Sequence, residues 1–360
     1  MMKLALVVAH IHRKNDKRVM RTVNALAEVM GVNYYYWTET PEKPETVGNI
    51  TYWPCFYKLS SNYRSRKQYE TALAERISQH YLTDLVYFHH YSATAPFKFY
   101  KPFSKVPVIT DFHEYLPDDY LAGIDKIPKW LRLLAGEHVF KGLCKFSSGL
   151  VSVNNFVLKT AEKYTDCPKL EVKNYGDYAL EPVAKAERNK EIVLVGKTTR
   201  KLDRERPMLE KLHEYGFKIT LIGSESKPPY DFMDYEPFLS YDEMMKRIGK
   251  AAFSLVSFDP TDSKGRIRLN YIHSSSNKAY DSICAGTPVI VADDFCELQN
   301  IRAKVVYRCC NPDLDAEFIN LMWTQFYENL LSQIPLDVRD CVWGAEKKSE
   351  FIKFCTDLIK

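Results

Sequence analysis

The stretch NKAYDSICAGTPVIV, residues 277–291, combines three signals of an α/β fold. Serines at 274–276 can cap a helix, Gly286 suits the position just after a helix, and Pro288 prevents continuation. The apolar residues that follow Pro288 predict a buried strand. The stretch therefore predicts a helix of about ten residues that leads directly into a strand of a parallel sheet.

Strand and helix patterns alternate along nearly the whole chain of 360 residues. Buried strands separated by amphipathic helices predict parallel sheets covered on both faces. The predicted strands are 3–10, 32–37, 85–90, 106–110, 149–153, 169–173, 191–196, 217–223, 251–258 and 288–292. The fold class we predict is α/β, with two Rossmann-like doubly wound domains in tandem.

The domain boundaries follow from a change in composition. At 179–190 the apolar pattern gives way to charge, which predicts a linker between a first domain at 1–178 and a second at 191–340. The last segment, 341–360, predicts an amphipathic helix. Because no strand follows this helix, we expect it to pack on a face already built.

Composition narrows the functional classes. Hydrophobic residues make up 46% and charged residues 27% of the chain, as in ordinary globular proteins. The surplus of basic over acidic residues, 50 − 46 = 4, is too small to suggest a nucleic-acid partner. The nine cysteines show no metal-type spacing, so reduced thiols in the cytoplasm are expected. No apolar run approaches the ~20 residues of a membrane-spanning helix.

Lys278 lies in the first turn of the predicted helix, where the partial charge of the helix is already positive. A lysine there is unfavourable by roughly 0.3–1 kcal/mol, unless an anion docks at the helix start. Asp281 follows on the same face as an acceptor suited to sugar hydroxyls. The alternative is a salt bridge between these two residues on a solvated helix.

A second group of cations follows the strand at 191–196, in the sequence VGKTTRKLDRER (195–206). Ligands of doubly wound folds bind outside the carboxyl ends of the strands, and the 277–291 helix begins at such an end. A basic loop at the same edge would complete a diphosphate pocket with Lys278. The alternative is a solvated charged loop.

These two stretches resemble the donor-binding segments of GT-B glycosyltransferases, particularly the family 4-like group. There the helix has the form Asn-Lys-hydrophobic-aromatic-Glu-Tyr, followed by Gly-x-Pro-Val-Ile, and a Gly-Arg…Lys loop holds the donor diphosphate. The stretches 15–28, 106–117 and 342–354 are similar to further family segments, the last being the helix that crosses back to the N-terminal domain. The resemblance implies a GT-B fold with two domains facing across a cleft.

The resemblance implies that the C-terminal domain binds a nucleotide-diphosphate sugar. The donor-binding residues it suggests are Gly196, Lys197, Arg200, Lys201, Gly223, Ser240, His273, Asn277, Lys278 and Asp281. His273 and Asp281 stand where the family has paired glutamates, which leaves the donor sugar and the stereochemical outcome open. Because basic side chains and a helix end offset the diphosphate charge, we expect neither a metal nor a cofactor.

The N-terminal domain is expected to bind the acceptor. His113 and Glu114 follow a strand end, and either can take the proton of the acceptor hydroxyl; the resemblance favours His113. The alternative is that they cap the following loop. His12 and Asp16 are acceptor-side candidates after the first strand, and Asp16 is expected to pair with Arg18 or to orient the loop.

The expected activity is transfer of a sugar to a hydroxyl of a glycan or lipid-linked acceptor during assembly of a surface polysaccharide. A sugar-nucleotide epimerase of related fold and a catalytically silent GT-B binding subunit stay open as alternatives. Aromatic residues interleave with Lys and Arg at 52–69 and 95–105, and 127–146 is amphipathic with basic residues. Such stretches fit either an anionic membrane surface or core-facing helices with snorkelling lysines, and the core-facing interpretation is favoured for 127–146. We expect a cytoplasmic protein, with 52–69 as the better candidate for contact with the inner face of the membrane.

Overall fold

The computed structural model describes residues 2–60, 63–80, 82–90, 99–121, 127–196, 202–224, 228, 230–257, 261, 268–295, 298–308 and 310–359. The chain divides into two compact units. Unit 1 consists of Met1–Lys173 and Ala345–Lys360, and unit 2 of Asn174–Gly344. Unit 2 thus begins ahead of the predicted 179–190 linker, and Asn189 and Lys190 at the end of that linker already belong to a strand.

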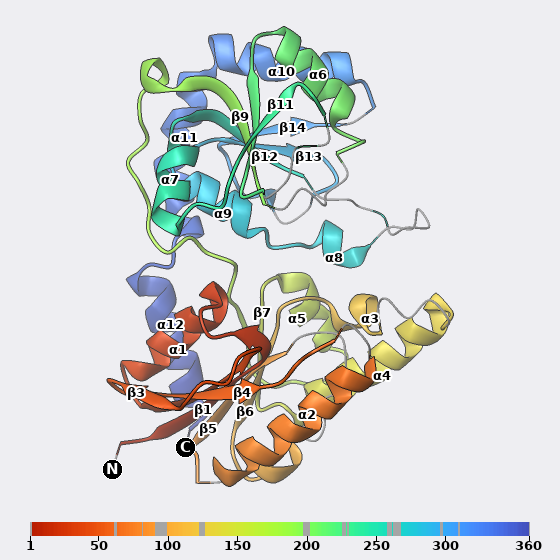
Figure 1. Ribbon diagram of the computed structural model, residues 1–360, viewed down its shortest axis with the longest axis vertical. Helices are drawn as coiled ribbons and strands as arrows, with labels where there is room; N and C mark the ends of the chain where they lie inside the picture. Colours follow the sequence, from red (N-terminus) through yellow and green to blue (C-terminus); the bar gives the residue numbers. More distant parts are fainter. Residues whose placement is uncertain are drawn as a thin grey trace. The chain divides into compact units, whose positions relative to one another are not determined.

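Unit 1 is built on an eight-stranded sheet in the order β3-β4-β2-β1-β5-β6-β7-β8 (Figure 1). Its strands are β1 (Leu4–Arg13), β2 (Gly31–Thr38), β3 (Glu45–Val47), β4 (Ile50–Phe56), β5 (Leu85–His90), β6 (Val108–Phe112), β7 (Gly149–Ser152) and β8 (Lys169–Glu171). All pairs are parallel except β3 with β4 at one edge. The strand order reverses between β1 and β5, where doubly wound folds bind their ligands.

Helices cover both faces of this sheet. They are α1 (Lys17–Ala27), α2 (Tyr63–Ile77), α3 (Leu116–Asp119), α4 (Lys129–Phe146), α5 (Asn155–Ala161) and α12 (Ala345–Asp357). Figure 1 shows α12 beside α1, and the ring of Phe351 in α12 lies 5.6 Å from that of Tyr87 in β5. The C-terminal helix begins at Ala345 and not at the predicted 341, because Cys341 ends a helix of unit 2.

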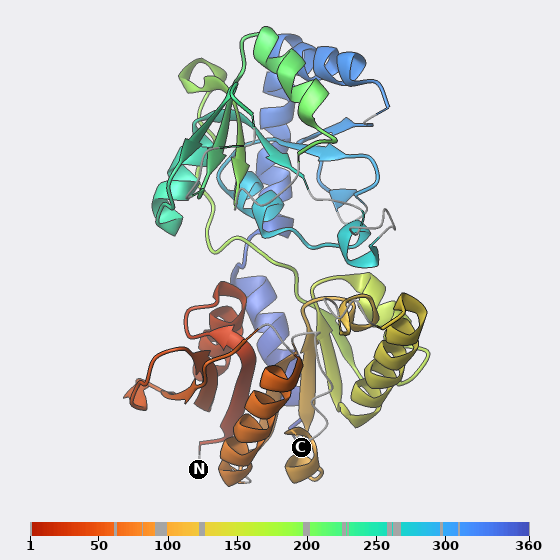
Figure 2. The same ribbon diagram turned by 45° about the vertical axis from the view of Figure 1, so that its right-hand side comes forward.

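Unit 2 is built on a six-stranded, wholly parallel sheet in the order β11-β10-β9-β12-β13-β14. Its strands are β9 (Asn189–Val195), β10 (Lys218–Ile222), β11 (Met233–Glu236), β12 (Ala251–Val256), β13 (Val289–Ala292) and β14 (Lys304–Tyr307). Its helices are α6 (Arg206–Glu214), α7 (Tyr241–Gly249), α8 (Leu269–Ile272), α9 (Asn277–Cys284), α10 (Pro312–Gln325) and α11 (Tyr327–Cys341). Figure 2 shows helices on both faces of this sheet, and the predicted pair of doubly wound domains is confirmed.

The 277–291 stretch forms α9 followed by β13. Between them Gly286 has a φ of 80°, which L-residues rarely adopt. A Cβ atom at this position would also lie 2.8 Å from the Cα of Pro182. The tight turn therefore requires glycine for both its backbone conformation and its packing.

Residues 50–56 correct the expectation for the 52–69 segment. They form β4, which pairs with β2 on one side and β3 on the other, and Tyr52 and Cys55 are buried. Some of the aromatic residues that suggested a membrane surface therefore belong to a strand within the sheet, and Tyr52 is part of the core. Pro54 obscured the strand, because proline removes a ladder donor and is confined to special positions in sheets.

The two ends of unit 2 are tied together. The Gly176 N–H donates to the Cys341 carbonyl and the Trp343 N–H donates to the Gly176 carbonyl, both at 2.8 Å. A Cβ on Gly176 would lie 2.7 Å from Cys284 Sγ at the end of α9. The segment that enters unit 2 is thus packed against both its exit and α9. Among the described residues, no helix is long and apolar enough to cross a membrane.

Candidate functional site

A distortion at the end of β1 marks the carboxyl edge of unit 1. His10 has a φ of 53°, and the register between β1 and β2 shifts between Val8 and Arg13. A buried non-glycine residue in this region of backbone conformation is uncommon and is held by its surroundings. Here α2 holds it: Glu70 Oε1 lies 2.9 Å from His10 Nε2, and the Tyr69 hydroxyl donates to the His10 carbonyl at 2.5 Å.

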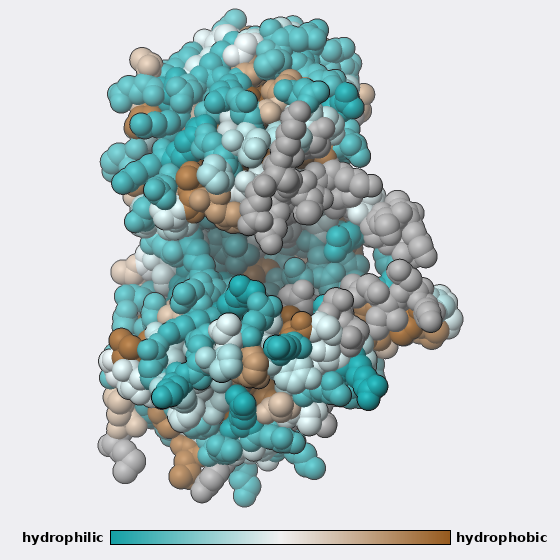
Figure 3. All heavy atoms as spheres, viewed as in Figure 1, coloured by the Kyte–Doolittle hydropathy of each residue, from teal (hydrophilic) through white to brown (hydrophobic). Residues whose placement is uncertain are grey.

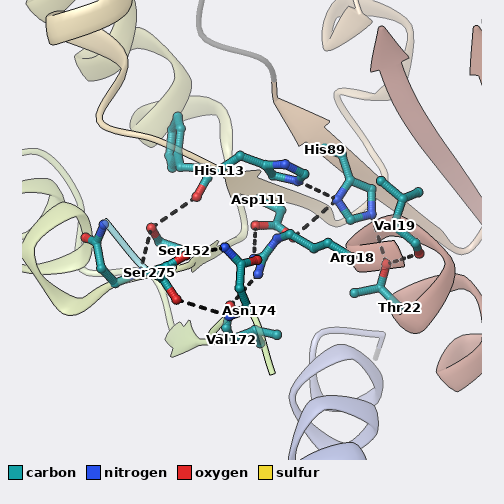
Figure 4. Close-up of polar contacts among 12 residues, drawn as sticks. Arg18, Val19, Thr22, His89, Asp111, His113, Ser152, Val172, Asn174 and Ser275 are labelled. Atoms are coloured by element: carbon teal, nitrogen blue, oxygen red, sulfur yellow. Dashed lines mark hydrogen bonds and ion pairs between the residues drawn. The ribbon is translucent and has the colours of Figure 1, made fainter. Parts of the chain in front are cut away.

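The centre of this edge is a buried ion pair between α1 and β6 (Figure 4). Arg18 Nη2 lies 2.6 Å from Asp111 Oδ1, and the two side chains are 7% and 0% exposed. Arg18 also donates to the Val172 carbonyl at 2.5 Å, and the Tyr87 hydroxyl donates to Asp111 Oδ2 at 2.9 Å. Burial alone would raise the pKa of Asp111, but the charge of Arg18 and a hydrogen bond from His89 hold that pKa well below its usual range.

Two histidines extend outward from the ion pair. His89 Nδ1 lies 3.2 Å from Asp111 Oδ2 and 3.0 Å from His113 Nε2, while its Nε2 lies 2.9 Å from Thr22 Oγ1 (Figure 4). Burial is the main cause that lowers the pKa of both His89 and His113. Both imidazoles are therefore neutral near pH 7, and a neutral His113 can accept a proton.

The structure brings the acceptor-side candidates of the sequence together around His113. The ring centroid of His12 lies 4.5 Å from that of His113, and His12 Nδ1 lies 3.3 Å from Asp16 Oδ2. Asp16 also caps α1, because its Oδ1 accepts from the Val19 N–H at 3.1 Å. Burial raises the pKa of Asp16, but the hydrogen bond and charge of His12 outweigh it, so the pKa lies below its usual range.

Two further expectations for unit 1 have different outcomes. Arg18, for which a pair with Asp16 or a role in orienting the loop was expected, forms a buried ion pair with Asp111, far away in the sequence. Glu114 directly follows His113, so it lies at the same edge of the sheet, and it is exposed. The contact of His89 with His113 and the presence of Thr22 beside His89 were not predicted from the sequence.

Three of these side chains have the geometry of metal ligands. His89, Asp111 and His113 each bring one ligand atom to within 4.8 Å of the other two. Three protein ligands are typical of catalytic zinc sites. However, Asp111 already faces Arg18 and Tyr87, so an incoming cation would compete with a guanidinium. The expectation of a metal-free site stays a prediction.

In unit 2, α9 presents its first turn at the carboxyl edge of the sheet. Lys278 Nζ is a buried atom, and the Ser282 hydroxyl lies 2.6 Å from the Lys278 carbonyl and 2.7 Å from Ser254 Oγ of β12. Among the described residues, the side chain of Ser276 makes no capping hydrogen bond at this end. The N–H groups at a helix start, together with a lysine, favour an anion.

Asp281 has a partner within unit 2. It is 7% exposed, and its Oδ1 accepts a hydrogen bond from the Tyr241 hydroxyl of α7 at 2.7 Å. Burial, followed by the charge of Asp281, raises the pKa of Tyr241 well above its usual value. The predicted contact of Asp281 with a ribose therefore stays a prediction, and Tyr241 is a neighbour that the sequence did not reveal.

The remaining donor-side candidates lie at strand and helix ends. Gly196 and Gly223 follow β9 and β10 with φ values of 126° and 84°, which suit glycine. Ser240 caps α7 in a capping box with Glu243. His273 follows α8 and is half-buried, and burial lowers its pKa. Three predicted donor residues lie outside the described residues: Lys197, Arg200 and Lys201.

The start of α9 is connected to the entry segment of unit 2. The Asn174 N–H donates to Ser275 Oγ at 3.1 Å, and its side-chain amide donates to the Ser275 carbonyl at 2.6 Å (Figure 4). Ser275 immediately precedes the N-cap residue of α9. These bonds fix the loop that positions Asn277 and Lys278.

Known structures share this fold over their whole length. An E. coli trehalose-6-phosphate structure bound with UDP-2-fluoro glucose is 12% identical, with 99% of both chains covered and a TM-score of 0.68. A UDP-forming α,α-trehalose-phosphate synthase from Burkholderia xenovorans is 11% identical, with 100% of both chains covered and a TM-score of 0.68. A synthase of the same description from Burkholderia vietnamiensis is 9% identical, with 99% coverage of both chains and a TM-score of 0.65.

No protein-family model and no curated protein sequence matches the chain. At identities this low, the structural likeness shows the fold alone. The GT-B fold expected from the sequence is therefore confirmed, whereas the family 4-like designation stays a prediction.

Proposed function

We propose that this chain transfers a sugar from a nucleotide-diphosphate donor to a hydroxyl group of an acceptor. The observation that carries the proposal is the start of α9, where Lys278 and an end without a side-chain cap among the described residues lie at the carboxyl edge of a GT-B unit. Two structures of similar fold support a nucleotide sugar as the donor: one is bound with UDP-2-fluoro glucose, and the other is that of a UDP-forming synthase.

In this proposal unit 2 stabilises the leaving group. The ammonium of Lys278 and the N–H groups of α9 offset the charge that develops on the diphosphate as the glycosidic bond breaks. Gly196 and Gly223 let the backbone approach the nucleotide, and Asp281 binds the ribose. Because the transition state resembles an oxocarbenium ion, stabilising the leaving group contributes more than a strong nucleophile.

Unit 1 supplies the acceptor side. His113 is neutral near pH 7 because burial lowers its pKa, so it can accept the proton of the attacking hydroxyl, with Glu114 beside it. The ion pair of Arg18 and Asp111 holds His89, which in turn contacts His113. The acceptor class we propose is a glycan or lipid-linked hydroxyl in surface polysaccharide assembly, at the cytoplasmic face of the membrane.

The acceptor class needs a direct test, because a Burkholderia xenovorans structure of similar fold is in complex with glucose-6-phosphate, a sugar phosphate and not a glycan or lipid. We would incubate the protein with a panel of UDP-, GDP- and ADP-sugars, with and without glycan, lipid-linked and sugar-phosphate acceptors. Released nucleotide and product masses would be measured. Acceptor-dependent release of nucleotide diphosphate is the expected result.

Two outcomes would overturn the proposal in favour of the alternatives. A changed sugar without any acceptor indicates an epimerase, and tight binding of a nucleotide sugar without turnover across the panel indicates a binding subunit.

Activity that survives a chelator in excess would support the metal-free site, whereas activity lost to chelator and restored by zinc would assign a cation to His89, Asp111 and His113.

A further inference from the structure

Among the helices that the structure describes, two expose an apolar pair one turn apart. In α4 these are Trp130 and Leu134, which are 61% and 62% exposed. In α10 they are Leu314 and Phe318, which are 60% and 45% exposed. Single exposed apolar residues need no explanation, but adjacent pairs on a helix face form a surface suited to a partner.

The two pairs differ in the charges around them. The α10 pair is surrounded in sequence by Asp313, Asp315 and Glu317. The α4 pair lies on a helix that carries only one acid, Glu137, and four cations: Lys129, Arg132, Lys141 and Lys145. The same spacing of apolar residues is therefore set in an acidic helix in one case and in a basic helix in the other.

The single acid of α4 does not offset these cations on the outer face. Glu137 accepts hydrogen bonds from the hydroxyl of Tyr115 at 3.0 Å and from that of Tyr164, both residues of unit 1. Lys141 and Lys145 are exposed and follow Trp130 and Leu134 along the helix. Figure 3 shows hydrophobic side chains gathered over α4 of unit 1. The outer face of α4 is thus apolar in its first half and basic in its second.

We propose that the outer face of α4, defined by Trp130, Leu134, Lys141 and Lys145, binds an anionic lipid bilayer. Tryptophan and leucine side chains enter the region between headgroups and acyl chains, and lysines pair with the lipid phosphates. A second copy of this chain fits the face less well, because the chain carries a formal net charge of +4, whereas an anionic bilayer offers the opposite charge to the cations of α4. The inference does not depend on the transfer reaction. It assigns the membrane contact to α4, whereas the sequence favoured 52–69.

The test is co-sedimentation of the full chain with lipid vesicles. The wild type should bind vesicles made of equal parts phosphatidylglycerol and phosphatidylcholine, and should not bind pure phosphatidylcholine. The double variant Trp130→Ser/Leu134→Ser should bind anionic vesicles about tenfold more weakly, because it loses the apolar anchor. Lys141→Glu/Lys145→Glu should reduce binding to a similar extent and remove most of its salt dependence.

The matched control is Leu314→Ser/Phe318→Ser on α10, which should leave vesicle binding unchanged. All these side chains are exposed, so melting temperatures should agree among the variants. Failure of the wild type to bind anionic vesicles overturns the inference, as does equal loss of binding in the α4 and α10 variants. A wild-type dimer that becomes monomeric in Trp130→Ser/Leu134→Ser would assign the face to self-association and overturn it as well.

Discussion

Charged side chains are arranged differently at the carboxyl edges of the two sheets. In unit 1 the described charges have internal partners: Arg18 pairs with Asp111, and His12 contacts Asp16. Unit 2 has a paired cation as well, because Arg204, after β9, contacts Glu205 and Asp294. What distinguishes unit 2 is Lys278 at the positive end of α9, beside Asp281, which accepts from Tyr241. Matched pairs make a rigid platform, whereas a cation placed against a helix start makes a place for an anionic ligand.

The largest effect should come from breaking the pair in unit 1. Arg18→Met leaves the buried charge of Asp111 unpaired, so the free energy of unfolding should fall by about 3–5 kcal/mol in urea titrations. Arg18→Met/Asp111→Asn should recover much of this loss. As a control, Arg206→Ala removes an exposed pair with Glu210 and should leave the urea midpoint nearly unchanged. A small loss in Arg18→Met would show that the pair is not the platform we describe.

The counterpart in unit 2 should change binding and leave folding intact. Lys278→Ala should lower donor affinity or turnover by about 100-fold, because under the proposed function it removes the cation that offsets the charge of the diphosphate. Its unfolding free energy should stay within about 0.5 kcal/mol of the wild type. Isothermal titration with a nucleotide diphosphate would measure the affinity, and Lys278→Arg should retain part of it. A variant that loses stability but keeps its affinity would contradict the site.

The contact of Asp281 offers a smaller effect. Tyr241→Phe removes the hydroxyl that donates to Asp281 and should lower the free energy of unfolding by about 1 kcal/mol. If Asp281 binds the ribose, Asp281→Asn should weaken binding of a nucleoside diphosphate, while Tyr241→Phe should change it little. Equal binding by wild type and Asp281→Asn would remove Asp281 from the donor site.

Part of the pH dependence of stability should come from two histidines of unit 1. The folded pKa values of His89 and His113 lie below the ordinary value, so the unfolded chain binds protons that the folded chain does not. Stability should therefore fall as the pH drops below about 6.5, by at most about 1.4 kcal/mol per pH unit for each histidine. Unfolding titrations of His89→Gln and His113→Gln should show a shallower fall. An unchanged slope in both variants would contradict neutral imidazoles in the folded state.

Much of the fold was predictable because it rests on local patterns. The helix and the strand of 277–291 follow from turn chemistry and apolar periodicity, and both are confirmed. The strand at Ile50–Phe56 was missed, because Pro54 and the surrounding aromatic residues gave no clear alternation. Pairing with β2 stabilises this strand, and such long-range pairing leaves little local signal.

The candidate site was predictable only in part. Residues next to strand ends, such as His113 and Lys278, could be placed at the carboxyl edges because doubly wound folds share that geometry. The partners of these residues could not be predicted. Arg18 meets Asp111, and Tyr241 meets Asp281, across long stretches of chain. Sequence spacing therefore identified which residues lie at each edge but not which charges neutralise one another.

The place of α12 has a consequence for how the protein is made. The helix belongs to unit 1 and buries Phe351 and Cys355, yet it is translated after the whole of unit 2. During translation, the sheet of unit 1 therefore stays uncovered near Tyr87 until α12 has been synthesised and Phe351 can pack there. Unit 2 has no such delay, so the domain translated first is the last to be completed.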